Sequence, residues 1–130
     1  MRREITGFSN PLVKQVRSLR EKKHRKREGL FLAEGLRIMT EAREAGFLPE
    51  MLFRCADRDA HSLEIVLEGE VLTAGGDVIE TSADILSKLS GKDNAQTVIG
   101  VYREHPTALS DIDRNSAPIW LVAQAMRDPG

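Results

Sequence analysis

Residues 30–46 read LFLAEGLRIMTEAREAG, and this stretch decides which class of fold the sequence predicts. Residues 30–33 form a short apolar run, which is typical of a buried β-strand. Glu34-Gly35 then supplies a turn, and the residues after it favour a helix that ends at Gly46. That helix would carry its apolar residues on one face: Ile38, Met39, Ala42 and Ala45. A strand, a turn and a helix in this order form the unit from which α/β domains are built.

The same alternation of strands and helices continues downstream. Three further apolar runs predict strands, at residues 51–55, 77–81 and 97–103. Between them, one helix is expected to begin at Ser62, as its cap, and to stop at Gly69, and another is expected to follow the cap Ser82. Together these elements predict an α/β fold. We expect a three-layer α/β/α sandwich over about residues 28–104, with a mostly parallel four-stranded sheet.

Upstream of this unit, residues 10–28 predict a helix rich in lysine and arginine. Asn10 can cap its first turn through the side-chain oxygen, and Pro11 suits the first helical position. The apolar stripe of the helix is short: Leu12, Val16 and Leu19. Residues 20–27 contain no apolar side chain, so this half of the helix is expected to project into solvent until Gly29 ends it.

Charge is distributed unevenly along the chain, although the formal net charge is only −1. Residues 1–28 contain ten Lys and Arg against three Glu, whereas the remainder contains nine basic and 17 acidic residues. A basic segment on an acidic body predicts a local site for a polyanion. Spaced Lys and Arg can neutralise phosphates and release counterions, which favours RNA or DNA as the ligand. The alternative is a solvated helix that binds nothing, and a membrane surface is disfavoured because the densest basic part lacks bulky apolar residues.

The sequence offers no clear catalytic or metal-binding residues. Cys55 lies in a predicted buried strand, and Asp57 and Asp59 are expected to be solvated loop charges. Three histidines have no neighbours at metal-ligand spacing: His24, His61 and His105. Aromatic residues make up only 5% of the chain, so a stacking platform for bases is not expected.

Length and composition are those of a single globular domain with a proper core, at 130 residues, 41% apolar and 30% charged. One cysteine excludes an intrachain disulfide and suits the cytoplasm, where we expect the protein to act. The first ten residues lack the apolar stretch of a signal peptide. No apolar run approaches the ~20 residues of a membrane span.

Two segments resemble the N-terminal RNA-recognition domain of SpoU/TrmH-type RNA ribose 2′-O-methyltransferases, which belong to the SPOUT superfamily. They are residues 10–46 and the stretch KDNAQTVIGV at residues 92–101. The matching features occur in the family's order and spacing: Asn10-Pro11, Lys14, Arg17, the basic stretch after them, Phe31 and Glu34-Gly35. The ending IWLVAQAMRDPG, at residues 119–130, resembles the first strand and turn of the family's knotted catalytic domain.

The resemblance implies a division of the chain into three parts. Residues 1–104 would form the RNA substrate-recognition domain, residues 105–118 a linker, and residues 119–130 the beginning of a catalytic domain. The parent enzyme would use S-adenosylmethionine to methylate ribosomal or transfer RNA, and it would dimerise through the knot. The 130-residue chain itself is expected to be inactive, to bind no cofactor and to be mostly monomeric. Residues 119–130 would be disordered or borrow a pairing strand, with Trp120 exposed.

The candidate RNA-binding residues follow from the basic segment and from the resemblance. They are Asn10, Lys14, Arg17, Arg20, Arg25, Lys26, Arg27, Glu34, Gly35, Lys92 and Asn94. In the family, the turn equivalent to Glu34-Gly35 faces RNA, and the helix that begins there can offer N–H groups and a partial positive charge. The alternative is that Glu34 only caps this helix and Gly35 only permits a tight turn. At Lys92-Asp93-Asn94, turn chemistry is favoured over binding.

Two other functions remain open on the sequence. The predicted sandwich resembles small RNA-binding ribosomal proteins, so the chain could act as a stand-alone RNA-binding module with no enzyme attached. It could also be a protein-interaction domain whose basic helix binds an acidic partner. A salt-dependent RNA-binding assay separates the last of these from the two RNA-binding functions.

Overall fold

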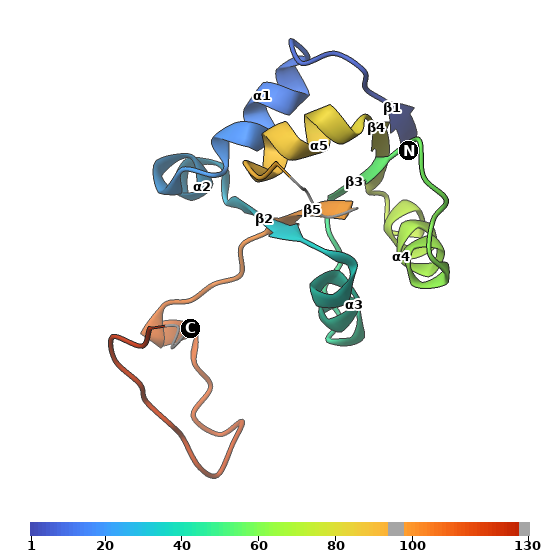
Figure 1. The fold of residues 1–130 in the computed structure, drawn as a ribbon. Coiled ribbons are helices and arrows are strands. Elements are labelled where there is room, and N and C mark those ends of the chain that lie inside the picture. The colour runs from blue at the N-terminus through green and yellow to red at the C-terminus, as the bar shows by residue number, and fades with distance from the viewer. Residues whose placement is uncertain (94–97, 128–130) are drawn as a thin grey trace.

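The computed structural model describes residues 1–93 and 98–127. A five-stranded sheet lies between two layers of helices (Figure 1). Its strands are β1 (Arg2–Glu4), β2 (Leu30–Glu34), β3 (Met51–Cys55), β4 (Asp77–Thr81) and β5 (Val98–Arg103). The α-helices are α1 (Pro11–Ser18), α2 (Lys22–Glu28), α3 (Leu36–Glu44), α4 (Ser62–Thr73) and α5 (Ala83–Ser90).

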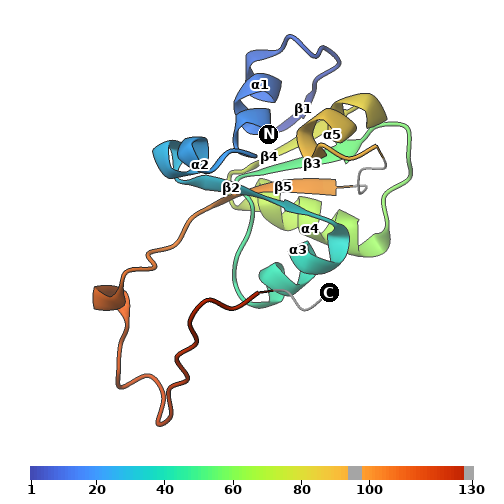
Figure 2. The ribbon, with the colours of Figure 1, turned by 60° about the vertical axis from the view of Figure 1, so that its left-hand side comes forward.

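The helices cover the two faces of the sheet in pairs, which confirms the predicted three-layer α/β/α sandwich. Helices α1 and α5 lie on one face, and α3 and α4 lie on the other (Figure 2). The core is accordingly split in two by the sheet. One cluster includes Val16, Leu19 and Ile85 under α1 and α5, and the other includes Met39 and Leu67 under α3 and α4. Cys55 is buried in the first cluster, as expected.

The sheet differs from the predicted one because it has five strands and is mixed. The strand order is β1-β4-β3-β5-β2. Strands β1, β4 and β3 run parallel, whereas β5 pairs antiparallel with both β3 and β2. Val98 lies opposite Arg54, so β5 begins beside the carboxyl end of β3. The connection through α5 thus returns the chain to the same end of the sheet, and β5 must run back.

The basic helix predicted over residues 10–28 is two helices, so that prediction is wrong in its continuity. Helix α1 begins as expected, with the Asn10 Oδ1 accepting a hydrogen bond from the Leu12 N–H at 2.9 Å. It ends when Leu19, which is 1% exposed, enters the core. Helix α2 buries no residue and ends at Gly29 with a φ of 68°. Its exposure is confirmed, but α1 packs beside α5 and is part of the sandwich.

Helix α4 also departs from its predicted limits. His61, rather than Ser62, caps it, because the His61 Nδ1 accepts from the Leu63 N–H at 3.1 Å. The helix then continues through Gly69 to Thr73. A glycine inside a helix costs about 1 kcal/mol, which the burial of Val71 two residues later can offset. The cap at Ser82 is confirmed, with its Oγ accepting from the Ile85 N–H at 3.2 Å.

Beyond β5 the chain leaves the sandwich, and within residues 104–127 it forms only one short 3₁₀ turn, Leu109–Asp111 (Figure 1). Trp120 is 48% exposed, as expected, and its indole N–H donates to the Arg114 carbonyl at 3.3 Å. The described residues contain no helix long and apolar enough to cross a membrane.

A buried ion cluster holds β1, the strand that the sequence did not predict. Arg54 on β3 donates to Glu64 on α4 at 2.9 Å and lies 3.0 Å from Glu68. Burial lowers the pKa of Arg54, but hydrogen bonding and charge interactions with these carboxylates outweigh that effect and raise it. Arg2 of β1 joins the cluster through Glu68, at 2.7 Å, and Glu80, at 3.2 Å. Charge pairing therefore secures a strand whose sequence, Arg-Arg-Glu, has no apolar signal.

This cluster predicts a large loss of stability when its central cation is removed. We expect Arg54→Met to lower the free energy of unfolding by about 3–5 kcal/mol, because it removes the hydrogen-bonded cation of the buried Glu64 and leaves the buried Glu68 with Arg2 alone. Arg37→Met is the matched control: Arg37 pairs with Glu41 on the surface, and the loss should be about 0.5 kcal/mol. Urea unfolding followed by circular dichroism measures both, and equal losses would contradict the structural role of Arg54.

Candidate functional site

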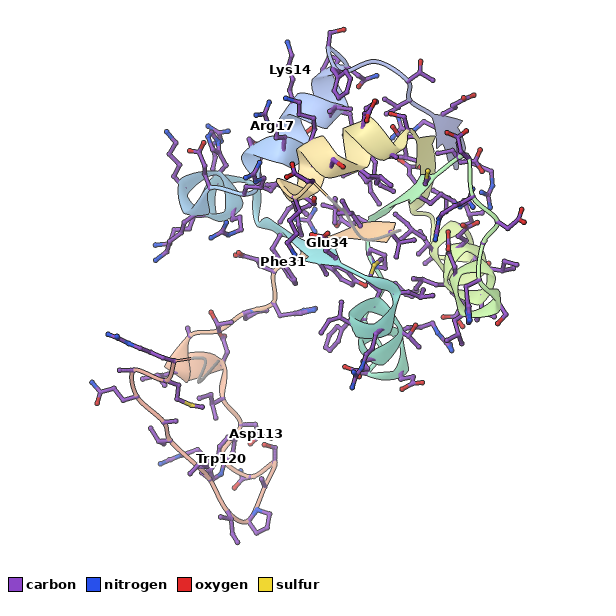
Figure 3. All side chains as sticks on the ribbon, in the orientation of Figure 1. Lys14, Arg17, Phe31, Glu34, Asp113 and Trp120 are labelled. Carbon is purple, nitrogen blue, oxygen red and sulfur yellow. The ribbon has the colours of Figure 1, made fainter. Side chains whose placement is uncertain are left out.

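Cations gather where α1 ends beside the carboxyl end of α5. Val13 and Val16 are buried, whereas Lys14 and Arg17 on the same helix are exposed to solvent (Figure 3). Arg20 follows directly after the buried Leu19 and is exposed. The apolar stripe that docks α1 thus decides the direction in which these cations point.

Arg20 lies over the last turn of α5. Gly91 caps that helix in the left-handed conformation, with a φ of 73°, and its N–H donates to the Ser87 carbonyl at 2.8 Å. A side chain at position 91 would collide with the Arg20 guanidinium. The carboxyl end of a helix carries partial negative charge, which favours a cation at this place. Glycine at 91 therefore serves both the helix cap and the position of Arg20.

The turn after β2 reaches the same region. Glu34 and Lys92, both predicted site residues, form an ion pair with 3.7 Å between Oε2 and Nζ. Gly35 adopts a φ of 106° and its N–H donates to the Val98 carbonyl at 3.0 Å. Because the Gly35 N–H is hydrogen-bonded within the fold, it is not available to a ligand. Gly35 instead permits the turn and occupies the N-cap position of α3.

Three hollows meet at Arg20. One, of about 510 Å³, lies over β2 and includes Arg25, Phe31 and Glu34 in its lining. The second, of about 440 Å³, lies between α1 and α5, and the third, of about 530 Å³, lies along α1 beside Lys14. The lining of the second hollow includes Phe8, Arg17, Arg20, Lys88 and Lys92. The surface around Arg20 is therefore concave and rich in cations, and we call it the Arg20 site.

The predicted residues divide into those that the Arg20 site contains and those that it does not. The structure brings six together: Lys14, Arg17, Arg20, Arg25, Glu34 and Lys92. Lys26 and Arg27 are exposed on α2 and line none of the three hollows, and Asn10 uses its side-chain oxygen as a cap. Asn94 lies outside the described residues.

Arg25 also has a structural task that its position in a basic run did not indicate. Its guanidinium donates to the carbonyls of Leu19, at 3.0 Å, and Arg20, at 2.8 Å. It therefore closes the junction between α1 and α2. Two further residues of the site, Phe8 and Lys88, were not predicted. They come from a turn before α1 and from the last turn of α5, and no single sequence pattern connects them.

The described residues contain no group of three or more metal-ligating side chains. Burial raises the pKa of Tyr102 to about 12, so its hydroxyl is neutral at physiological pH. Tyr102 stacks on Phe31 with ring centroids 5.7 Å apart, in the core cluster under α3 and α4. Asp57 and Asp59 are exposed, as expected of loop charges. The Arg20 site thus has the features of a binding surface for an anion.

Residues 10–100 match the family described as the MRM3-like substrate binding domain. The chain belongs to this family. The match covers most of the sandwich, including α1, β2 and the turn at Glu34-Gly35 that form the Arg20 site. The fold is likewise that of the N-terminal domain of SpoU-type methyltransferases, as three solved structures indicate.

The rRNA methyltransferase from Sinorhizobium meliloti superposes on this chain with a TM-score of 0.75 and 30% sequence identity. The match covers 85% of this chain and 40% of that one. The same protein has also been solved with AdoMet bound. An RNA 2′-O ribose methyltransferase superposes with a TM-score of 0.67 and 30% sequence identity. The match covers 85% of this chain and 41% of that one. The SpoU methyltransferase AviRb from Streptomyces viridochromogenes superposes with a TM-score of 0.61, and the match covers 78% of this chain and 36% of that one. Because the sequence identity is only 22%, this match supports the fold alone. The chain spans about two fifths of the first two relatives. Comparison with curated protein sequences gives no match.

Two glycine substitutions test the geometry beneath Arg20. Gly91→Ala should lower the free energy of unfolding by about 1–2 kcal/mol, because alanine is strained in the left-handed region and would meet the Arg20 guanidinium. Gly69→Ala is the matched control, since a methyl group there meets nothing within 4 Å. It should raise the free energy by about 0.5–1 kcal/mol, the usual gain within a helix. Urea unfolding of both variants measures the two signs, and stabilisation by both would contradict the described cap.

Proposed function

We propose that the MRM3-like domain binds the RNA substrate of a SpoU-type RNA ribose 2′-O-methyltransferase through the Arg20 site. The observation that carries the proposal is the convergence of four cations on one hollow: Arg17 and Lys88 from α1 and α5, and Arg20 and Lys92 from the residues that follow these helices. The rest of the chain after residue 28 is acidic, so this concentration of cations is not a general property of the surface. Phosphates are the ligands that such a cluster neutralises, with release of counterions.

The relatives support an RNA rather than another polyanion. The Sinorhizobium meliloti protein is an rRNA methyltransferase, and a second relative is an RNA 2′-O ribose methyltransferase, both at 30% identity. We infer that this chain serves the same chemistry on ribosomal or transfer RNA. Its role would be to hold the RNA while the ribose hydroxyl is presented to a catalytic domain. The parent enzyme would act in the cytoplasm as a homodimer.

S-adenosylmethionine would supply the methyl group in that parent enzyme, and the relative from Sinorhizobium meliloti is known with AdoMet bound. The three hollows at Arg20 do not suit this cofactor, because its sulfonium is a cation and the hollows are lined by arginine and lysine. We therefore assign no methyl-transfer step to the described residues. What they contribute is the binding and orientation of RNA.

Charge reversal on α1 tests the RNA-binding role. The double variant Lys14→Glu/Arg17→Glu should bind a short single-stranded RNA at least tenfold more weakly at low salt, because it removes two phosphate contacts. The slope of log K against log salt should fall in magnitude by roughly 1.4, at about 0.7 per contact. Fluorescence anisotropy across a salt series measures both quantities.

The matched control for this test is Lys23→Glu/Lys26→Glu on α2. It makes the same charge change on exposed residues away from the three hollows, and it avoids Arg25, whose guanidinium closes the helix junction. We expect it to weaken RNA binding less than the α1 pair does. The free energy of unfolding of both variants should stay within ~0.5 kcal/mol of that of the parent chain. Unchanged binding by both variants would leave the basic segment as a solvated charge run.

The cofactor assignment gives a separate expectation. Calorimetric titration of the 130-residue chain with S-adenosylmethionine should give no binding heat, while the same preparation binds RNA. The physical reason is the cationic lining of its hollows. Micromolar binding of the cofactor by this chain would show that the described residues contain a methyl-donor site after all.

A further inference from the structure

The hollow between α1 and α5 has an aromatic ring at its border. Phe8 is 49% exposed and lines the hollow together with four cations and two carboxylates: Arg17, Arg20, Lys88, Lys92, Asp84 and Asp93. Phe8 belongs to neither core cluster, so the packing of the sandwich does not account for its position. An exposed aromatic side chain beside several cations is the combination with which proteins bind single-stranded nucleic acids.

The backbone holds Phe8 in place before any ligand arrives. It lies in a turn that is closed by a hydrogen bond from the Asn10 N–H to the Gly7 carbonyl, at 3.2 Å. Asn10 is also fixed, because its side chain caps α1 through the Leu12 N–H. Two hydrogen bonds therefore anchor the short turn that carries Phe8. Pre-organisation of this kind reduces the entropy lost when a ligand binds.

We propose that this hollow receives one unpaired nucleotide of the RNA, with its base stacked on Phe8 and its flanking phosphates against Arg17, Arg20, Lys88 and Lys92. This inference rests on the proposed RNA-binding function and defines the substrate as RNA with an unpaired base. A base inside a duplex has both faces covered by its neighbours, so it cannot stack on a protein ring. A volume of about 440 Å³ lies within the usual range for pockets that bind small molecules.

Asp84 gives the hollow a feature that a plain phosphate site would not have. It lies in the first turn of α5 and is an acceptor among cations. A carboxylate repels phosphate, but it can accept hydrogen bonds from the amino groups of bases such as cytosine. A hollow with a ring, cations and a carboxylate fits a whole nucleotide better than it fits an isolated phosphate.

The test compares Phe8 variants on two RNA probes of the same length, one single-stranded and containing 2-aminopurine, the other a duplex. Phe8→Ala should weaken single-strand binding by roughly 5- to 150-fold, the range for loss of one base–aromatic stack, and should leave duplex binding unchanged. Phe8→Trp should retain single-strand binding, whereas Phe8→Leu, which is apolar but lacks a flat ring face, should not. Quenching of 2-aminopurine fluorescence should depend on an aromatic residue at position 8.

Phe47→Ala is the matched control. Phe47 is 43% exposed, contacts the His105 ring and lies away from the hollow, so this change should not alter binding of either probe. Thermal unfolding of each variant checks that the fold is retained. Equal single-strand affinities for the parent, Phe8→Ala and Phe8→Leu would overturn the stacking site. The RNA-binding function would then still stand if the Lys14→Glu/Arg17→Glu loss persists, whereas absence of binding to both probes by the parent chain would overturn both proposals.

Discussion

The burial of Leu19 is the constraint on which the functional surface depends. Leu19 caps the carboxyl end of α1 and is buried in the core. Residues 20–27 contain no apolar side chain, so a continuation of α1 in the same direction would have nothing to bury. The basic residues that follow turn away as α2, and Arg25 closes the junction by donating to the Leu19 carbonyl. Arg20, the next residue after Leu19, is thereby placed over the end of α5. One buried leucine thus separates cations that converge on the sandwich from cations that only surround α2.

The convergence at Arg20 has an electrostatic cost, because four cations border one small hollow and like charges repel. The fold reduces this cost in three ways: the carboxyl end of α5 faces Arg20, Glu34 pairs with Lys92, and two carboxylates, of Asp84 and Asp93, line the same hollow. None of these fully neutralises the group. A surface selected only for solubility would intersperse charges of both signs, so the remaining positive potential is best explained by an anionic ligand.

The parts of the fold that follow from local patterns could be predicted from the sequence. The caps at Asn10 and Ser82 and the strands β2 to β5 belong to this group, because each depends on residues that are neighbours in the chain. Strand β1 could not be predicted, since its charged sequence is held by Arg2 pairing with α4 and β4. The break after α1 has no glycine or proline to mark it. In the site, the exposed cations of α1 could be predicted from the periodicity of its apolar residues. Phe8 and Lys88 could not, because they are far apart in the sequence and come together only in the folded structure. A low aromatic content argued against a stacking platform, but a count cannot show where a single ring lies.

Strand β5 sets the distance between the turn at Glu34 and the point where the chain leaves the sandwich. It begins at Val98, one residue before Ile99, which lies opposite Glu34, and it ends at Arg103 opposite Leu30. Arg103 is fixed there by two hydrogen bonds to Glu50, at 2.6 and 3.2 Å, and the following N–H, of Glu104, donates to Gly29. Five steps along a strand cover roughly 17 Å, so the exit point and the turn at Glu34 lie at opposite ends of the sheet. The Arg20 site covers part of this distance, because Phe31 in its lining lies opposite Tyr102, the residue before Arg103. In the proposed enzyme, an RNA that extends from the turn at Glu34 along β2 would approach residues 104–127. Ile119, Leu121 and Val122 of that segment are all highly exposed, so these three side chains do not pack against the sandwich.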